Sequence, residues 1–351
     1  MTKRKSNFTL VTGGAGYIGS HCLVELIKNG YNPIVVDNLS NSSLQAIKNV
    51  EKITKKKIIF YNQDLGNKKK LEQIFLKYFI NSVIHFAGLK SVEESYNKPL
   101  KYYRNNINIS ICLLETMQKF NVKKLIFSSS ASVYGDAINM PINEKEPVRP
   151  TNPYARSKSI IEKMCLDIIK SDENLNKEGW KILLLRYFNP IGAHKSGMIG
   201  EDPKNTLGNI MPILLRVANK EVESFKIFGD DYNTPDGTGI RDYIHVMDLA
   251  RGHLAALKYI LKLDKKKSLC RPINLGNGTG VSVIKIINEF NKITKKNLNI
   301  TIERRRKGDP AMSYADVRVA KKLLGWKTKE NLHSMIKDTW NWKTKNPDGY
   351  K

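Results

Sequence analysis

The sequence predicts an α/β protein in which a doubly wound parallel sheet is joined to a second, smaller α+β domain. Three observations support this prediction. Short β-branched runs alternate with longer amphipathic segments through the first half of the chain, as in successive βαβ units. After Phe188 this alternation fades, and glycine, proline and asparagine become frequent. The length of 351 residues also fits two units, at about 150 residues per domain.

The strands and helices of the first half are expected in regular order. Each strand candidate is a short apolar run, and each helix candidate carries apolar residues at helical spacing. Gly30 follows the first helix, where it can act as a C-terminal stop. The expected strands are 8–12, 33–37, 57–61, 82–86, 124–128 and 181–188, and the expected helices are 18–29, 43–54, 69–79, 100–120 and 154–170.

The predicted domain boundary lies at residue 188. Residues 1–188 form the first expected domain and residues 189–351 the second, with segments around 245–275 returning to the first. Periodic stretches near 209–219, 245–263 and 283–293 separate loops of the kind that carry binding residues.

Composition and charge narrow the class of protein. The net charge of +26 favours anionic partners, but the lysine runs are spread along the chain without interleaved aromatic residues, as on a solvated surface. The sequence has no apolar run of about 18 residues and no signal-peptide pattern, which predicts a cytoplasmic protein without a membrane partner. The spacing of the 4 cysteines and 6 histidines suggests neither a disulfide framework nor a metal site.

A glycine-rich loop between the first strand and the first helix predicts a dinucleotide site. Gly13, Gly16 and Gly19 allow a tight turn, close approach of a pyrophosphate and close helix packing, and the helix N-terminus offers N–H donors to phosphate. Asp37 ends the second strand, where its carboxylate can accept from the hydroxyls of an adenosine ribose and repel a 2′-phosphate. The expected cofactor is therefore NAD rather than NADP, bound on a Rossmann sheet.

A tyrosine and a lysine form the candidate catalytic pair. Tyr154 and Lys158 are four residues apart at the start of a predicted helix, so they share a face. An ammonium beside a phenol lowers the phenol's pKa, which favours proton transfer near neutrality. Ser130 ends a serine run after a predicted strand, where open α/β sheets bind ligands, and its hydroxyl can share a substrate proton with Tyr154. Because such spacing also arises by chance, the pair gains weight from the serine run at the strand end and from the dinucleotide loop.

Several longer motifs resemble those of the UDP-glucose 4-epimerases, which are extended short-chain dehydrogenases/reductases. The resemblance runs from about Phe8 to Tyr350 and rests on residues 12–21 (TGGAGYIGSH), 85–90 (HFAGLK), 128–135 (SSSASVYG), 185–190 (LRYFNP) and 236–246 (DGTGIRDYIHV). It implies a homodimeric isomerase of galactose metabolism. Such an enzyme interconverts UDP-glucose and UDP-galactose through a transient 4-keto sugar, using tightly bound NAD.

The resemblance also implies a role for individual residues. Tyr154 is the expected base, Lys158 holds the nicotinamide ribose, and Ser130 bridges to the sugar O4. The positive charge of NAD is expected to lower the pKa of Tyr154 further. The implied cofactor contacts besides these three and the glycines at 13, 16 and 19 are Tyr17, Ile18, Asp37, Asn38, Leu39, Ser40, Asn41, Ser42, Asp64, Leu65, Phe86, Ala87, Gly88, Leu89, Lys90, Asn105 and Phe188.

The second half is expected to bind the UDP-sugar. Besides Ser130 and Tyr154, the implied contacts are Asn189, Asn209, Ile210, Ile227, Phe228, Arg241, Arg306, Asp309 and Ser313. Two arginines suit a pyrophosphate, because a guanidinium can pair bidentately with phosphate oxygens. Some members of the family carry a bulky tyrosine at the position of Ser313. The small serine leaves room for an N-acetyl group, so UDP-N-acetylglucosamine and UDP-N-acetylgalactosamine are expected as further substrates.

Two alternatives stay open. A related NAD-dependent sugar-nucleotide dehydratase or decarboxylase has the same build, but dehydration usually needs acidic residues just after the serine, where this chain has Ala131 and Ser132. An RNA-binding protein could use the positive charge, and its affinity should then fall steeply with salt.

Overall fold

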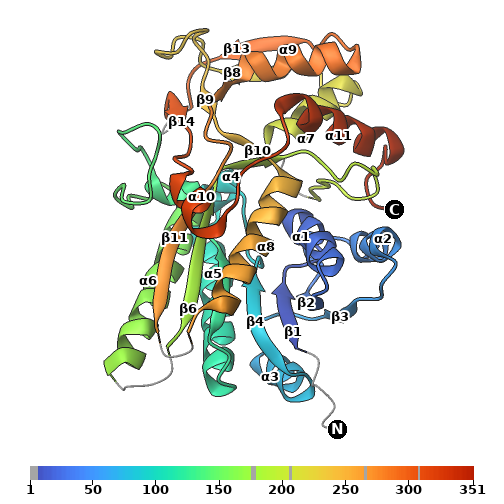
Figure 1. Ribbon diagram of the computed structural model, residues 1–351. Coiled ribbons are helices and arrows are strands. Elements are labelled where there is room, and N and C mark those ends of the chain that lie inside the picture. The colour runs from blue at the N-terminus through green and yellow to red at the C-terminus, as the bar shows by residue number, and fades with distance from the viewer. Residues whose placement is uncertain (1–6, 175–178, 205–207, 265–266, 307–308) are drawn as a thin grey trace.

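A computed structural model describes residues 7–174, 179–204, 208–264, 267–306 and 309–351, and the remaining parts of the predicted domain ranges lie outside the described residues (Figure 1). Seven strands form one parallel sheet: β1 (Phe8–Thr12), β2 (Asn32–Asp37), β3 (Ile59–Asn62), β4 (Ile80–His85), β5 (Lys124–Ser128), β6 (Lys181–Tyr187) and β11 (Leu269–Leu275). Their order is β11-β6-β5-β4-β1-β2-β3. The chain order reverses at β1, which pairs with β2 on one side and β4 on the other, and ligands of such sheets bind at the carboxyl ends of these strands.

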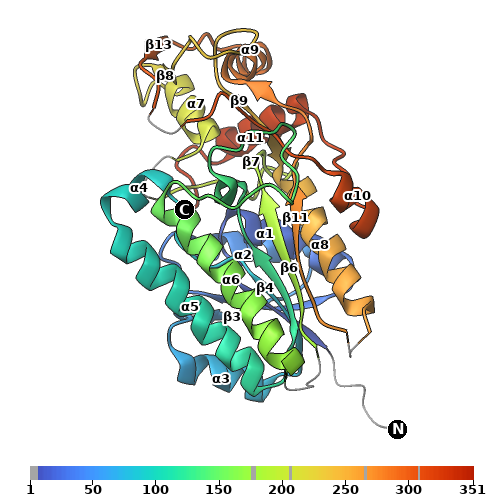
Figure 2. The ribbon, with the colours of Figure 1, turned by 90° about the vertical axis from the view of Figure 1, so that its left-hand side faces the viewer.

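Helices cover both faces of the sheet. They are α1 (Tyr17–Lys28), α2 (Leu44–Thr54), α3 (Lys68–Lys77), α4 (Val92–Asn97), α5 (Pro99–Lys119), α6 (Pro153–Asn174) and α8 (Val246–Lys262), with a short 3-10 turn, η1 (Ala131–Tyr134), after β5. Helices α1, α2 and α8 pack on one face of the sheet, and α3, α5 and α6 pack on the other. Figure 2 shows α5 and α6 side by side along the second face.

Alternation along the strands explains these two layers. In β1, Val11 faces the α1 side and Leu10 the α5 side, and in β6 Leu183 and Leu184 divide in the same way. All four side chains are at most 2% exposed. Because both faces are buried, the central strands consist of nearly continuous apolar runs, which is why the sequence predicted them well.

The rest of the chain lies at the carboxyl ends of the strands, in the upper part of Figure 1. It contains β7 (Asn189–Ile191), α7 (Ile210–Ala218), β8 (Phe225–Phe228), β9 (Ile240–Arg241), β10 (Tyr243–His245), β12 (Val281–Ser282), α9 (Val283–Thr294), β13 (Ile300–Glu303), β14 (Met312–Ser313), α10 (Arg318–Leu324) and α11 (Leu332–Lys345). Small sheets pair β7 with β10, β8 with β13, and β9 with β12 and β14. A core of their own, between α7, α9 and α11, supports these strands.

The structure adds elements that the sequence analysis did not predict, among them α10 and α11 in the second half of the chain. The sheet has seven strands rather than the six expected, because β11 extends it beyond β6. Strand β11 was missed because Arg271, Pro272 and Asn274 interrupt its apolar residues. A proline is tolerated there because the strand lies at the edge of the sheet. Helix α4 was also missed, since it is only six residues long. No helix among the described residues is both long and apolar enough to cross a membrane.

Candidate active site

The glycine loop between β1 and α1 passes very close to the end of β4. Gly13 has φ +70°, and a Cβ there would lie 2.6 Å from the backbone nitrogen of Ala87. A Cβ on Gly19 would lie 2.4 Å from the carbonyl oxygen of Gly13. Both positions therefore require glycine, and the tight loop leaves the N-terminus of α1, capped by Gly16 without a side-chain bond, free to face an anion.

Asp37 ties this loop to the segment that follows β2. Its Oδ2 accepts from the backbone N–H of Ala15 at 3.0 Å, and its Oδ1 accepts from the N–H of Leu39 at 2.9 Å and the hydroxyl of Ser42 at 2.8 Å. A carboxylate offers about four acceptor sites, so about one is left for a ribose hydroxyl. The sequence analysis expected the carboxylate to serve both ribose hydroxyls; the structure shows that it also organises the loop.

The other predicted cofactor positions lie at the carboxyl ends of neighbouring strands. Asn38 donates from its side-chain amide to Asp64 at 2.8 Å, which joins the ends of β2 and β3, and Leu65 is buried beside them. Ser40 and Asn41 complete the turn after β2, and Tyr17 and Ile18 begin α1. The stretch from Phe86 to Lys90 follows β4.

Asn106 was missed by the sequence analysis, which selected its neighbour Asn105. The Asn106 side chain accepts from the N–H of Leu89 at 2.8 Å and donates to the carbonyl of Leu89 at 3.1 Å. It also donates to the hydroxyl of Ser157 at 3.0 Å, and it is buried. Asn106 therefore fixes the loop after β4 against helix α6, while Asn105 is half-buried on α5.

The structure brings Ser130, Tyr154 and Lys158 together at the end of β5. Ser130 caps η1, while Tyr154 and Lys158 lie in the first two turns of α6, 8% and 4% exposed. The ammonium of Lys158 donates to the carbonyl of Ser128 at 2.9 Å and lies 5.9 Å from the centre of the Tyr154 ring. The Gly88 backbone also lies close by, since a Cβ added there would be 3.2 Å from Asn106 Oδ1 and 3.8 Å from the Lys158 Nζ.

The electrostatics of this pair differ from the sequence-based expectation. Burial raises the pKa of Tyr154 above its ordinary value, and the hydrogen bond from the Ser130 hydroxyl opposes that rise only in part. Burial also lowers the pKa of Lys158 to about 8, against a smaller opposing effect of the Glu162 carboxylate. In the cofactor-free protein Lys158 does not lower the pKa of Tyr154; its ammonium bonds to the Ser128 carbonyl and lies 5.9 Å from the centre of the Tyr154 ring.

A buried ion pair beneath the serine run was also missed. Glu162 accepts from the Ser129 hydroxyl at 2.5 Å and from Arg186 Nε at 2.9 Å and Nη2 at 2.5 Å. The guanidinium lies 4.8 Å from the ring centre of Tyr134, whose hydroxyl donates to Asn274 at 2.6 Å. This network joins β5, α6, β6 and β11 behind the candidate catalytic residues. Its sequence signal is that Glu162 lies one helical turn after Lys158.

The predicted substrate residues lie on the small strands, and on the loops beside them, that follow the carboxyl ends of the large sheet. Arg241 in β9 forms an ion pair with Asp309 at 3.6 Å, and the guanidinium of Arg306 lies 3.7 Å from the ring centre of Phe228. Ser313 in β14 pairs in parallel register with Arg241. The remaining substrate positions are Asn189, exposed in β7; Asn209 and Ile210 at the start of α7; and Ile227, buried in β8. Phe188, predicted as a cofactor contact, is buried just after β6.

Comparison with known proteins agrees with this arrangement. A family model described as GDP-mannose 4,6 dehydratase matches residues 10–339. The UDP-glucose 4-epimerase of Dictyostelium discoideum is 52% identical over 341 residues, which are 97% of each chain. This chain belongs to the UDP-glucose 4-epimerase family. The family lies within the extended short-chain dehydrogenases/reductases, as the sequence motifs suggested.

Solved structures extend the likeness to the whole fold of this epimerase family. The UDP-glucose 4-epimerase of Bifidobacterium longum, in complex with NAD+ and UDP, is 46% identical with a TM-score of 0.91, and the match covers 98% of this chain and 100% of that one. The enzyme of Stenotrophomonas maltophila, with bound NAD and formylated UDP-arabinopyranose, is 41% identical with a TM-score of 0.92, covering 97% and 98%. The predicted α/β fold class is confirmed.

Proposed function

We propose that this protein is a UDP-glucose 4-epimerase that interconverts UDP-glucose and UDP-galactose through a transient 4-keto sugar, using tightly bound NAD. The observation that carries the proposal is the meeting of Ser130, Tyr154 and Lys158 at the end of β5, beside a glycine loop that tolerates no side chains at Gly13 and Gly19. The family supports the same activity.

The residues at the strand ends fit a dinucleotide. The glycine loop forms a cradle that a Cβ would fill, the N-terminus of α1 would face the phosphates of the cofactor, and the Asp37 carboxylate would repel a 2′-phosphate. When bound, NAD would supply hydride acceptance and return at C4 of the hexose, together with a positive charge that favours the ionised phenol. Lys158, whose ammonium already bonds to a backbone carbonyl in the site, would hold the nicotinamide ribose.

Tyr154 would take the proton of the sugar O4 hydroxyl and return it after the sugar has turned over. Ser130 is placed to relay that proton, since its hydroxyl bonds to the phenol and lies at the start of η1. Burial of both Tyr154 and Lys158 excludes water from the transfer and strengthens each polar contact.

The UDP-sugar would lie between the sheet and the upper strands. Arg241 and Arg306 can turn their guanidinium groups from Asp309 and Phe228 to a pyrophosphate, which offers stronger, bidentate bonds. Ser313, half-buried beside Arg241, leaves space for an N-acetyl group, so we propose that N-acetylhexosamine nucleotides are also substrates.

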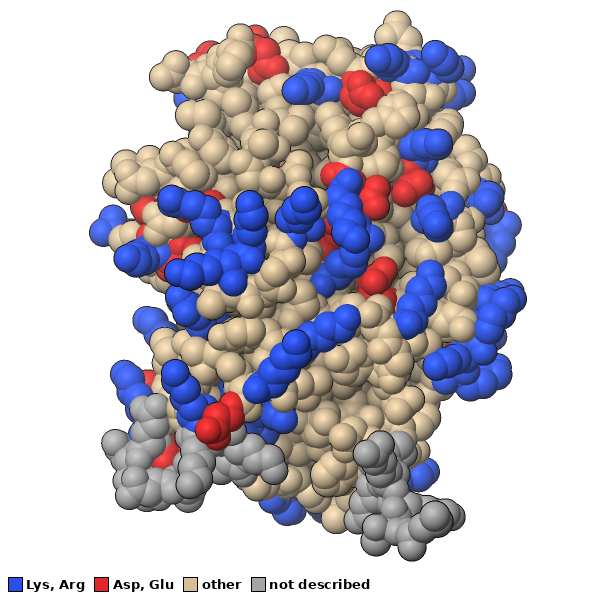
Figure 3. Space-filling view, in the orientation of Figure 1, with Lys and Arg blue, Asp and Glu red and all other residues tan. Residues whose placement is uncertain are grey.

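The alternatives have less support. Ala131 and Ser132 lie in η1, where a dehydratase would need an acid or base. Figure 3 shows basic side chains scattered over the visible face with acidic ones among them, rather than gathered in one groove that would suit RNA.

We further propose a cytoplasmic homodimer with two domains. Free cysteines at 22, 112, 165 and 270 suit a reducing compartment. Leu100 and Ile111 on α5, 76% and 38% exposed, and Leu166 on α6, 42% exposed, are apolar side chains exposed on two adjacent helices, which a second copy could cover. The proposed domains are 1–188 for NAD and 189–351 for the UDP-sugar, with 245–275 assigned to the first.

The deciding experiment is incubation of purified protein with UDP-galactose without added NAD, followed by sugar analysis. Formation of UDP-glucose is expected. In a parallel incubation with added NAD, accumulation of NADH in step with substrate would instead indicate a dehydrogenase. Tyr154→Phe should lose most of the activity while keeping bound NAD. Full activity of that variant would disprove the role of the phenol.

A further inference from the structure

Residues 192–204 form a segment, here called the strap, that contacts three elements around the glycine loop. The hydroxyl of Tyr17, at the start of α1, donates to the carbonyl of Gly192 at 2.6 Å. Asn49 in α2 donates to the carbonyl of Met198 at 2.8 Å, and Lys204 donates to the carbonyl of Leu39 at 3.4 Å. The strap therefore touches the elements that follow both β1 and β2.

Glu201 in the strap joins two sets of predicted site residues. Its Oε1 accepts from the ammonium of Lys90 at 2.9 Å and from the side-chain amide of Asn209 at 2.7 Å. Lys90 belongs to the predicted cofactor set and Asn209 to the substrate set. The Glu201 side chain is only 9% exposed, and the Lys90 ammonium lies 6.0 Å from the centre of the Tyr17 ring. Glu201 thus links the cofactor side to the substrate side through one carboxylate oxygen.

Residues 346–351, here called the hook, hold the strap on both sides of Glu201. The hydroxyl of Tyr350 accepts from the N–H of Gly200 at 3.0 Å and donates to its carbonyl at 3.2 Å. The backbone N–H of Tyr350 donates to the carboxylate of Asp202 at 2.9 Å. Both neighbours of Glu201 in the chain are therefore fixed by the same residue.

Aromatic packing sets the position of Tyr350. Its ring centre lies 4.6 Å from that of buried Trp342 in α11. Gly200 lies directly against the same indole, since a Cβ there would be 2.3 Å from Trp342 Cγ. Tyr350 and Gly200 are thus held together by one buried side chain.

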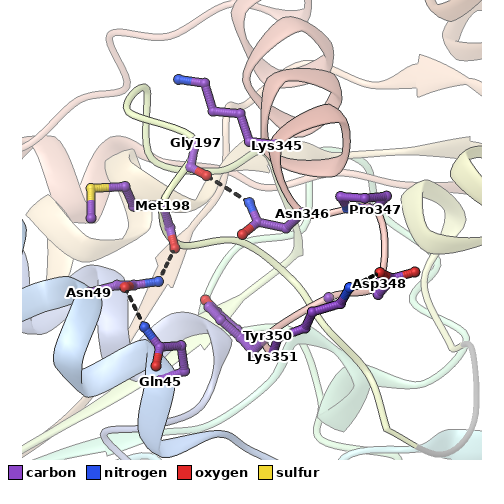
Figure 4. A pocket seen from close by; sticks show the side chains of 11 residues that line it. Gln45, Asn49, Gly197, Met198, Lys345, Asn346, Pro347, Asp348, Tyr350 and Lys351 are labelled. Carbon is purple, nitrogen blue, oxygen red and sulfur yellow. Dashed lines mark hydrogen bonds and ion pairs between the residues drawn. The ribbon is translucent and has the colours of Figure 1, made fainter.

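The hook is not embedded in a core. Cavities of about 470 and 380 Å³ adjoin it, one lined by Gln45 and Asn49 of α2 and the other by Glu221 and Lys343. Figure 4 shows the first, with Asn346 bonded to Gly197 and Asn49 bonded to Met198. The hook is therefore held against the strap by a small number of polar contacts and by the packing of Tyr350 on Trp342.

We propose that Tyr350 is a positioning residue that acts through Glu201. By fixing Gly200 and Asp202, the hook keeps the Glu201 carboxylate between Lys90 and Asn209, which couples retention of the dinucleotide to binding of the UDP-sugar. This inference rests on the proposed function, because it assigns Lys90 and Asn209 to those two ligands.

Three full-length variants and one control test the proposal. Tyr350→Phe keeps the ring against Trp342 and removes only the two hydroxyl bonds to Gly200. Glu201→Gln keeps an acceptor for Asn209 and removes the charge that faces Lys90. The third variant combines both substitutions. The control, Lys345→Met, removes a 3.0 Å bond from the same region of the chain to the strap, at the carbonyl of Ser196, away from Glu201.

Four measurements are made on each purified protein: NAD remaining after extensive dialysis, kcat, KM for UDP-galactose, and melting temperature. Tyr350→Phe is expected to lower NAD retention and to raise KM, each by about five- to tenfold, the effect of one or two hydrogen bonds. Its kcat per molecule of bound NAD should stay within twofold of wild type. The double variant should match Glu201→Gln alone, and Lys345→Met should match wild type.

Several outcomes overturn the inference. They are wild-type NAD retention and KM in Tyr350→Phe, multiplication of the two single effects in the double variant, or an equal effect of Lys345→Met. If the wild-type chain keeps NAD but does not epimerise, the proposed function fails, and the comparison of NAD retention still decides whether the hook acts through Glu201.

Discussion

Replacing Arg186 with methionine is expected to destabilise the fold by about 3–5 kcal/mol, because it leaves a charged carboxylate in the interior. The side chains of Arg186 and Glu162 are 6% and 5% exposed, and two of the three bonds to Glu162 come from the guanidinium. Methionine keeps much of the aliphatic packing. The loss should therefore come from the unpaired carboxylate rather than from a cavity.

Urea unfolding followed by tryptophan fluorescence measures this loss as the difference in the free energy of unfolding. The double variant Arg186→Met, Glu162→Leu removes both charges and should recover most of the stability. Lys68→Met is the matched surface control: it breaks a 2.7 Å pair with Glu115 in which both side chains are about half-exposed, and it should change stability by less than about 1 kcal/mol. An Arg186→Met protein within 1 kcal/mol of wild type, or a double variant that loses the sum of the single effects, would refute the reasoning.

Three further predictions concern the site and its surroundings. Burial lowers the pKa of Lys158 from 10.5 to about 8, so between these pH values the unfolded chain holds a proton that the folded chain lacks. The free energy of unfolding of the cofactor-free protein should rise over this pH range by about 3 kcal/mol relative to Lys158→Met, and parallel pH curves would contradict it. Ser313→Tyr should lose activity on UDP-N-acetylglucosamine by more than tenfold while keeping activity on UDP-glucose, measured by the epimer ratio of each product; equal loss on both sugars would argue against a steric role. Leu100→Glu combined with Ile111→Glu should convert a dimer to a monomer in light scattering, and an unchanged mass would place the interface elsewhere.

The first half of the fold could be predicted from sequence because its signals are local. The strands from β1 to β6 are short apolar runs, and the helices between them show apolar residues at helical spacing. The glycine loop was also predictable, because the structure requires glycine at these positions. A Cβ on Gly13 or on Gly19 would lie less than 3 Å from a backbone atom. Ser130, Tyr154 and Lys158 were selected in the same way, from a strand end and a helix start.

The features that were missed depend on contacts between distant parts of the chain. Asn105 and Asn106 are neighbouring asparagines on α5, so the sequence does not distinguish them. Only the hydrogen bonds of Asn106 to Leu89 and Ser157, which are distant in the chain, show that Asn106 holds the loop after β4. Burial raises the pKa of Tyr154, and the burial of one side chain in the folded protein is not revealed by its spacing along a helix. Likewise, Tyr350 and Gly200 meet across 150 residues.

Strand β11 has a consequence for biosynthesis of the chain. It supplies one edge of the parallel sheet, and α8, which precedes it, covers the face that also carries α1. A ribosome must therefore release residue 275 before the edge of β6 is paired and that face is closed. Until then the nascent protein exposes an apolar surface and an unpaired strand, so its early folding depends on protection from other growing chains.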